Sequence, residues 1–276
     1  MSTISAQSVA DRAFAPRAAV GLRAEAGFED RLTQAPLRRI EAKELLFAEG
    51  DAASHLYRIE TGAIALYTVL NDGRRQIMGF AYPGDLLGLG IKREHDMNAQ
   101  AIKPTRVRCL SAASLRQAAA KDPALALKLY EALAAELAAT RDLLITTGQR
   151  SALERVAGFL LAFSRRNDRN GLDPEAFELP MTRTDIGDLL GLTIETVSRT
   201  LTKLRSLRVI ELPRCHEVRV RNLDALERMA EGAGQEASLI FAELDPHEVR
   251  HRFRRELVNT DEERLGVGLG RRNRRV

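Results

Sequence analysis

The stretch "MTRTDIGDLLGLTIETVSRTLTKLRSLRVI", residues 181–210, predicts two short helices separated by "GLT". The first has apolar residues at the helical spacing i, i+3 and i+4: Ile186, Leu189 and Leu190. Thr182 or Thr184 suits the start of this helix, because a threonine hydroxyl accepts a hydrogen bond from a free backbone N–H. Gly191 suits the left-handed position that ends a helix. The first helix is therefore expected to stop at the "GLT" turn.

The second helix is predicted to bury one face and expose the other. Thr193 is a suitable cap, and Leu192 and Val197 have the spacing of a hydrophobic staple. Val197, Leu201 and Leu204 share one face, which is expected to point into the core. Two short helices joined by a turn that contains a glycine are the layout of a helix-turn-helix, whose second helix enters the DNA major groove.

The opposite face of the second helix carries a polar ladder, Glu195, Ser198 and Arg199. An arginine fork matches guanine O6 and N7, a carboxylate accepts from cytosine N4, and a serine hydroxyl serves a base or a phosphate. The alternative is that Glu195 only complements the helix dipole and pairs with Arg199. A basic margin in and around the next predicted hairpin (residues 209–212 and 217–220) favours DNA binding: Arg205, Arg208, Arg214, Arg219 and Arg221.

Residues 37–111 consist of short apolar runs that alternate with turn signals. The runs are "ELLFAEG", "HLYRIETG", "AIALYTVL", "RQIMGFAYPG" and "TRVRCLS". Turns are expected at Gly50-Asp51, Thr61-Gly62, Asn71-Asp72-Gly73 and Pro83-Gly84-Asp85. Asp72-Gly73 favours a tight hairpin, because such a pair supplies the positive φ angles of the turn. Regular short strands of this kind predict an antiparallel sandwich or roll.

A long helix is predicted after the strands. Residues 113–122 form a short helical pattern, and Pro123 then suits the first turn of the next helix, whose pattern Gly148 ends. One stripe of this helix recurs every three or four residues: Ala126, Leu129, Leu133, Leu137, Thr140 and Leu144. Such a stripe is typical of a seam between two copies of a chain, and it is also compatible with a helix packed on its own roll. A third helix, "SALERVAGFLLAFSRRN", and a polar loop, "DRNGLDPEAFE", lead to the opening stretch.

These patterns resemble the Crp/Fnr superfamily of transcription regulators, closest to its FixK-like branch, over residues 37–231. "TRTDIGDLLGLTIETVSRTLTKL" is similar to the family's helix-turn-helix, and "LFAEGDAASHLYRIETGAIALY" to the start of its β-roll, including the turn glycines Gly50 and Gly62. The resemblance implies an α+β fold with an N-terminal cyclic-nucleotide-binding-type β-roll, a long dimerisation helix and a C-terminal winged helix-turn-helix.

The expected organisation follows from this resemblance. The segments are a flexible N-terminal arm (residues 1–28), a β-roll sensor-type domain (29–122), the dimerisation helix (123–148), the winged helix-turn-helix DNA-binding domain (149–231) and a partly disordered tail (232–276). The dimer interface is expected along the long helix, at Leu129, Leu133, Leu137, Thr140 and Leu144.

The resemblance also implies how DNA is bound. By similarity to the Fnr and FixK branches, the base-reading residues are Ile194, Glu195, Ser198 and Arg199, and the target is a TTGAT-N4-ATCAA-like palindrome read by a homodimer. Phosphate contacts are expected from Thr182, Arg183, Thr193, Thr202, Lys203 and Arg214. The implied function is that of an activator that binds double-stranded DNA, contacts RNA polymerase and acts in oxygen-responsive or nitrogen-fixation-type circuits.

The effector region departs from the superfamily's cyclic-AMP pattern. In "GDLLGLGIKREHDMNAQA", Leu89 stands where that pattern has a glutamate, and Ala99 and Gln100 stand where it has an arginine and a serine. Cyclic AMP is therefore not expected to bind. The oxygen-sensing pattern of an N-terminal cysteine cluster is also missing, since residues 1–50 contain no cysteine. No cofactor and no metal are expected.

A ligand-gated sensor of the same superfamily remains the alternative. Lys92 and Arg93 could meet an anion other than cyclic AMP, and His55 or His95 could serve a haem. A third hypothesis is a roll-based module whose helix-turn-helix makes protein contacts. No constellation of histidine, carboxylate and nucleophile has a usable spacing, so an enzyme is not expected.

Composition is compatible with this assignment. The 276 residues carry a formal net charge of +4, which permits a polyanion partner without requiring one. The apolar run "VAGFLLAF" is far shorter than the ~20 residues that cross a bilayer, so we expect a cytoplasmic protein with no membrane partner. Cys109 and Cys215 are too few for a disulfide framework, and a redox role for either stays open.

Overall fold

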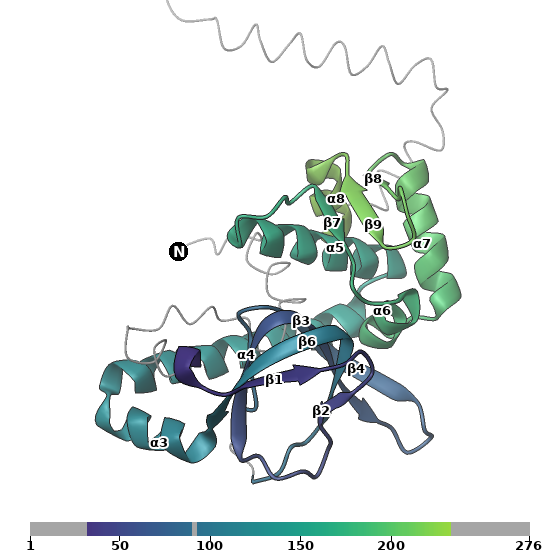
Figure 1. The fold of residues 1–276 in the computed structure, drawn as a ribbon. Helices are drawn as coiled ribbons and strands as arrows, with labels where there is room; N and C mark the ends of the chain where they lie inside the picture. The colour runs from purple at the N-terminus through teal and green to yellow at the C-terminus, as the bar shows by residue number, and fades with distance from the viewer. Residues whose placement is uncertain (1–31, 90–92, 233–276) are drawn as a thin grey trace, which may run out of the picture. The chain divides into compact units, whose positions relative to one another are not determined.

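The computed structural model describes residues 32–89 and 93–232. The expected N-terminal arm, Lys92 and nearly all of the expected tail lie outside the described residues. Six strands form the first sheet, which Figure 1 shows curving into a roll. They are β1 (Leu37–Ile40), β2 (Leu45–Phe47), β3 (His55–Val69), β4 (Arg75–Ala81), β5 (Leu86–Leu87) and β6 (Asn98–Ser111).

The two long strands, β3 and β6, organise the roll. All pairs are antiparallel, with the order β1-β6-β3-β4, while β2 pairs with β6 and β5 with β3. The hairpin expected at Asp72-Gly73 joins β3 to β4, so that prediction is confirmed. Ile59 and Ile64 of β3 and Val107 of β6 are almost completely buried in the roll's own core.

The turn expected at Thr61-Gly62 is wrong, because β3 runs unbroken through this point. The pairing of β3 with β6 instead shifts register on both sides of Gly62, as at a β-bulge, which bends a strand without ending it. Gly62 has φ +99°, and a Cβ there would lie 2.6 Å from the Cα of Thr105. Only glycine fits this conformation and this approach of β6.

Two helices follow the roll, α3 (Ala112–Lys121) and α4 (Pro123–Gln149). The carboxylate of Asp122 caps α4 by accepting from the backbone N–H groups of Ala124 and Leu125, at 3.0 and 3.2 Å. Pro123 occupies the first turn, as predicted, because its missing N–H has no partner to lose there. Gly148 was expected to end the helical pattern, but it lies inside the last turn of α4.

The apolar stripe of α4 divides between its own chain and the surface. Leu125 is buried, and Leu129 packs on the same cluster of roll and α3 residues. In contrast, Leu133, Leu137 and Leu144 are exposed by 36, 52 and 73%. The start of α4 therefore packs on its own roll, whereas the rest of the stripe presents leucines to the surface.

The C-terminal half is a winged helix-turn-helix. Its elements are α5 (Ala152–Arg169), β7 (Ala176–Glu178), α6 (Arg183–Leu190), α7 (Ile194–Ser206), β8 (Ile210–Glu211), β9 (Glu217–Val220) and α8 (Leu223–Ala230). The predicted hairpin is confirmed as β8 and β9. The prediction of a polar loop up to residue 178 is wrong at its end, because β7 pairs with β9 and buries Phe177. The fold class predicted from the sequence is confirmed.

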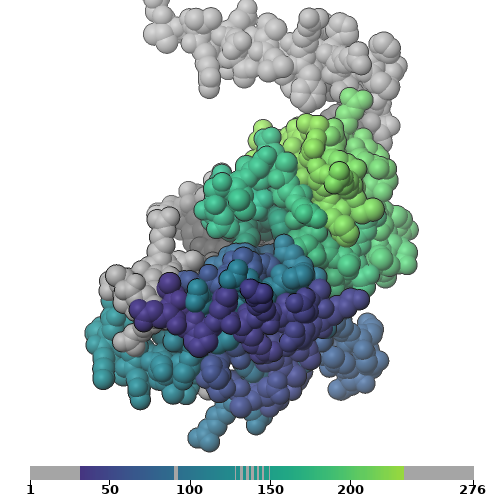
Figure 2. All heavy atoms as spheres, viewed as in Figure 1, coloured from purple at the N-terminus to yellow at the C-terminus, as the bar shows by residue number. Residues whose placement is uncertain are grey.

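One hydrophobic cluster includes side chains from both halves. Ile77, Phe80 and Tyr82, at the end of the roll, belong to the same cluster as Leu160 of α5 and Leu189 of α6. The space-filling view shows the purple-to-blue roll against the green part of the chain (Figure 2). Burying apolar surface contributes a free energy of about 25 cal/mol per Å², so this junction stabilises the fold.

Replacing Gly62 by alanine is expected to destabilise the protein much more than replacing Gly73. Both glycines have positive φ, but only at Gly62 would the new Cβ meet backbone atoms; at Gly73 nothing lies within 4 Å. The conformational penalty is about 1–2 kcal/mol at either site, and the overpacking adds about 1–3 kcal/mol at Gly62 alone. Denaturant unfolding of the two variants measures the difference, and equal losses would contradict this account of the bulge.

Candidate nucleic-acid interface

A reciprocal capping box fixes the start of α6. The Thr182 hydroxyl accepts from the backbone N–H of Asp185 at 3.1 Å, and the Asp185 carboxylate accepts from the backbone N–H of Thr182 at 2.9 Å. The sequence left Thr182 and Thr184 open as caps, and the structure selects Thr182. Gly191 ends the helix in the left-handed conformation, with φ 65°, as predicted.

The turn between α6 and α7 depends on a glycine that the sequence reasoning missed. A Cβ at Gly187 would lie 2.6 Å from the carbonyl oxygen of Leu192, so the absent side chain allows the turn to approach α6. Gly187 lies four residues before the glycine of "GLT", and this spacing is the signal that could have found it. Thr193 then caps α7 by accepting from the backbone N–H of Thr196 at 3.2 Å.

Helix α7 has the two faces that its sequence predicts. Val197, Leu201 and Leu204 are 0, 4 and 0% exposed and lie in the core. On the other side Glu195 and Arg199 are exposed, with the half-buried Ser198 at the edge, and Ile194 is 44% exposed at the start of the helix. An isoleucine exposed at the start of this helix is suited to an apolar contact with a partner.

Each member of the polar ladder has a defined local partner. Backbone N–H and Thr193 hydroxyl hydrogen bonds, with the nearby Arg199 charge, hold the pKa of Glu195 below its ordinary value. Arg183, on α6, donates from Nη1 to the hydroxyl oxygen of Ser198 at 3.2 Å. Arg199 makes only a long contact, 3.5 Å, to the Thr196 hydroxyl. Among the described residues no ion pair joins Glu195 to Arg199, so both charges remain available to a partner.

The residues expected to contact phosphate lie around this face. Thr182, Thr193, Thr202, Lys203 and Arg214 are exposed, and Arg183 is half-buried. We call the hairpin of β8 and β9 the wing. Two arginines of the basic margin form ion pairs there: Arg219 with Glu217 at 3.0 Å, and Arg221 with Glu211 at 2.6 Å. In the part of the chain that the structure describes, Arg205, Arg208 and Arg214 are exposed and unpaired. The basic margin is thus narrower than the sequence predicted.

The positions that depart from the cyclic-AMP pattern, and the two histidines considered for haem, make contacts within the roll itself. Ala99 is fully buried, and the Gln100 side chain donates to the Lys43 carbonyl oxygen at 2.9 Å. His95 is buried with its ring stacked on Phe47, 3.6 Å between centroids, and burial lowers its pKa. His55 shares a 2.9 Å hydrogen bond with the Ser54 hydroxyl. Within residues 32–89 and 93–232, no group of three His, Cys, Asp or Glu side chains could hold a metal ion.

The two cysteines lie in different environments. Cys109 is half-buried and burial raises the pKa of its thiol, whereas Cys215 is exposed in the wing. None of the described helices is long and apolar enough to cross a membrane.

Comparisons with known proteins agree with this architecture. Residues 37–122 match the family "Cyclic nucleotide-binding domain", and residues 154–229 match "Crp-like helix-turn-helix domain". The nitrogen fixation regulation protein FixK of Bradyrhizobium diazoefficiens is 42% identical over 161 residues, 58% of this chain and 68% of that protein. The fumarate and nitrate reduction regulatory protein of Escherichia coli (strain K12) is 33% identical over 193 residues, 69% of this chain and 77% of that protein.

A solved structure gives the same result. The structure of FixK2 from Bradyrhizobium japonicum has a TM-score of 0.67 and 38% sequence identity, and covers 71% of this chain and 96% of that one. A roll followed by a helix-turn-helix with a free polar face defines a DNA-binding transcription regulator rather than an enzyme. Within that class, the chain belongs to the Crp/Fnr family and to its FixK-like branch.

Proposed function

We propose that the protein is a homodimeric transcription activator that binds a TTGAT-N4-ATCAA-like palindrome in promoters and contacts RNA polymerase. The observation that carries this proposal is the exposed surface of α7, where Glu195 and Arg199 stand opposite a buried face, Ser198 lies at the edge and Ile194 is exposed at the start of the helix. A relative from Rhizobium leguminosarum bv. viciae, 35% identical over 192 residues, is described as a probable transcriptional activator. That description supports activation rather than repression.

The chemistry of the face suits base reading in the major groove. The Glu195 carboxylate is an acceptor for cytosine N4, the Arg199 guanidinium is a two-pronged donor for guanine, and Ile194 matches a thymine methyl group. A carboxylate repels the phosphate backbone, so Glu195 lowers the affinity for every sequence and discriminates between bases. We call the exposed surface of α7, with Ile194, Glu195, Ser198 and Arg199, the reading face. The residues proposed to contact phosphates around it are Thr182, Arg183, Thr193, Thr202, Lys203 and Arg214.

Dimerisation is proposed along the exposed part of α4. Leu133, Leu137 and Leu144 recur at coiled-coil spacing and remain exposed in the single chain. Thr140 lies within this stripe, and Leu129 marks the point where it leaves the roll. A two-fold arrangement would present two copies of α7 to successive major grooves, about one helical turn apart.

The proposed physiological setting follows the relatives' names. They include regulators of nitrogen fixation and of fumarate and nitrate reduction, which supports a role in oxygen-responsive or nitrogen-fixation-type circuits within the cytoplasm. Selection of bound DNA from a random pool, with ligand-free protein at stated salt, tests the proposal. Recovery of the palindrome supports it; recovery only after a small molecule is added supports the ligand-gated sensor instead, and no enrichment overturns DNA reading.

Arg199→Ala and Arg214→Ala are expected to weaken DNA binding in different ways. Loss of a base-reading arginine should cost about 1–3 kcal/mol and relax the preference at one base pair of each half-site. Loss of the exposed wing arginine should weaken all sequences alike and reduce the slope of log affinity against log salt by about 1. Binding titrations on the palindrome and on single-base variants, at several salt concentrations, separate the two. Unchanged selectivity in Arg199→Ala would refute its role as a base reader.

Arg183→Ala is expected to change selectivity as well as affinity. Because the Ser198 oxygen accepts from Arg183, its O–H can donate to a base acceptor such as thymine O4 or a purine N7. Arg183→Ala should therefore weaken the preference at the same base pair as Ser198→Ala. The double variant should be no less selective than Ser198→Ala alone. If the variant instead loses the same affinity for every DNA sequence, Arg183 contacts phosphate and does not contribute to selectivity.

Leu137→Glu is expected to separate the dimer. A carboxylate in an apolar seam costs its full desolvation, so the variant should sediment as a monomer and bind the palindrome far more weakly. Leu127→Glu is the matched control, because Leu127 is equally exposed, 57% against 52%, but lies about 80° from Leu137 around the same helix. Sedimentation equilibrium measures both, and a dimeric Leu137→Glu protein would place the interface elsewhere.

A further inference from the structure

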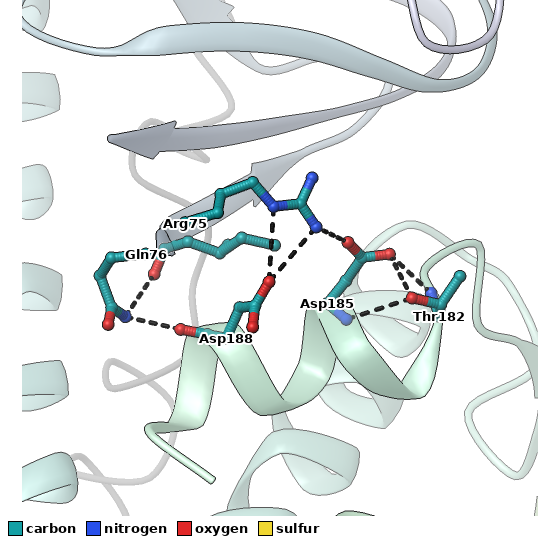
Figure 3. Close-up of polar contacts among 6 residues, drawn as sticks. Arg75, Gln76, Thr182, Asp185 and Asp188 are labelled. Carbon is teal, nitrogen blue, oxygen red and sulfur yellow. Dashed lines mark hydrogen bonds and ion pairs between the residues drawn. The ribbon is translucent and has the colours of Figure 1, made fainter. Parts of the chain in front are cut away.

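Side chains of β4 in the roll bind helix α6 of the helix-turn-helix. Arg75 donates from Nη2 to the Asp185 carboxylate, and its Nε and Nη2 both lie 3.4 Å from Oδ2 of Asp188. The neighbouring Gln76 donates from Nε2 to the backbone carbonyl oxygen of Asp188 at 2.6 Å. Figure 3 shows the two side chains reaching from the strand to the same side of the helix. We call Arg75, Gln76, Asp185 and Asp188 the β4–α6 clamp.

The clamp holds the carboxylate that also caps α6. One oxygen of Asp185 accepts from the backbone N–H and the hydroxyl of Thr182, at 2.9 and 2.7 Å, and the other accepts from Arg75. The Asp185 side chain is only 10% exposed and that of Arg75 is 30% exposed. A charge-assisted hydrogen bond between partly buried groups is stronger than a surface ion pair. The roll is therefore fastened to the first turn of the helix-turn-helix.

Neighbouring contacts restrict movement of the clamp. The guanidinium of Arg75 lies over the Tyr67 ring, 5.3 Å from its centroid, which fixes the arginine from the roll side. A second arginine, Arg166, comes from α5 and binds residues of the roll. Its guanidinium carbon lies 4.6 Å from the Tyr82 ring centroid, and its Nη2 lies 3.3 Å from the Asp85 carboxylate. The two halves are thus joined at two helices, α5 and α6, with the apolar cluster between them.

The clamp leaves the reading face uncovered. Asp185 and Asp188 are three residues apart and share one side of α6, whereas the polar ladder stands on α7 and keeps its exposure. The contact therefore does not block DNA. The clamp restricts the orientation of the helix-turn-helix before DNA binds. Less conformational entropy is then lost on binding, which increases the affinity.

We propose that Arg75 is a positioning residue for DNA recognition, which holds α6 through Asp185 and Asp188 so that α7 is set on the roll in its DNA-binding orientation. This inference rests on the proposed function, because it concerns the affinity of the same face for the palindrome. It assigns to the roll a role in DNA binding that requires no effector.

Arg75→Ala is expected to weaken binding to the palindrome about tenfold, equivalent to ~1.4 kcal/mol. Arg74→Ala is the matched control: the side chain of this adjacent arginine is 77% exposed and, among the described residues, pairs only with Asp72 in its own turn, so affinity should not change. Asp188→Ala removes the longer of the two Arg75 contacts from the α6 side without touching the cap. The loss in the double variant should equal that of Arg75→Ala alone, because Arg75→Ala already deletes the contact to Asp188.

Fluorescence anisotropy with labelled palindromic DNA measures these affinities, and hydrogen exchange of the α6 amides reports release of the helix. Thermal unfolding of each variant checks that the fold persists, and Arg75→Lys, which keeps the charge but loses the fork, should recover part of the affinity. If Arg75→Ala binds as tightly as the native protein, or more tightly, positioning is overturned. If the native protein itself does not select the palindrome, the proposed function fails instead.

Discussion

Burial of one face of α7 is the constraint on which the DNA-binding half depends. Val197, Leu201 and Leu204 are held in the core, and a helix of 3.6 residues per turn must then present Glu195 and Arg199 outward. The cap at Thr193 and the close approach of the turn at Gly187 fix where this helix begins. The buried face, the cap and the turn therefore determine which side chains a partner meets.

Features of this half that rest on neighbouring residues could be predicted from the sequence. The periodicity of α7, the left-handed Gly191 and the β8–β9 hairpin all depend on residues a few positions apart. Long-range features could not be predicted: the "AFE" of β7 reads as loop because its partner, β9, lies some 40 residues on, and β3 passes through Gly62 because β6 supplies the pairing. The Arg75–Asp185 contact spans 110 residues and has no local signal.

The candidate site shows the same division between local and long-range information. The outward placement of Glu195 and Arg199 follows from spacing alone, whereas Ile194 was expected to contact DNA only because of the family resemblance. The hydrogen bond from Arg183 to Ser198 depends on how two helices cross, which no periodicity encodes. The pairing of Arg219 and Arg221 with wing glutamates likewise appears only in the folded hairpin, and it reduces the positive charge available to a polyanion.

The roll retains its architecture although the residues of the cyclic-AMP pattern are replaced. Ala99 lies in the core and Gln100 bonds the backbone of Lys43, so these two positions stabilise the roll, as does the stacking of His95 on Phe47. A roll whose residues at these positions serve packing still has a surface. Here that surface is β4, which carries a guanidinium and an amide to the start and middle of α6. A roll of this kind is best understood as a support for the helix-turn-helix, because its most specific polar contacts outside its own sheet are made with the DNA-binding half.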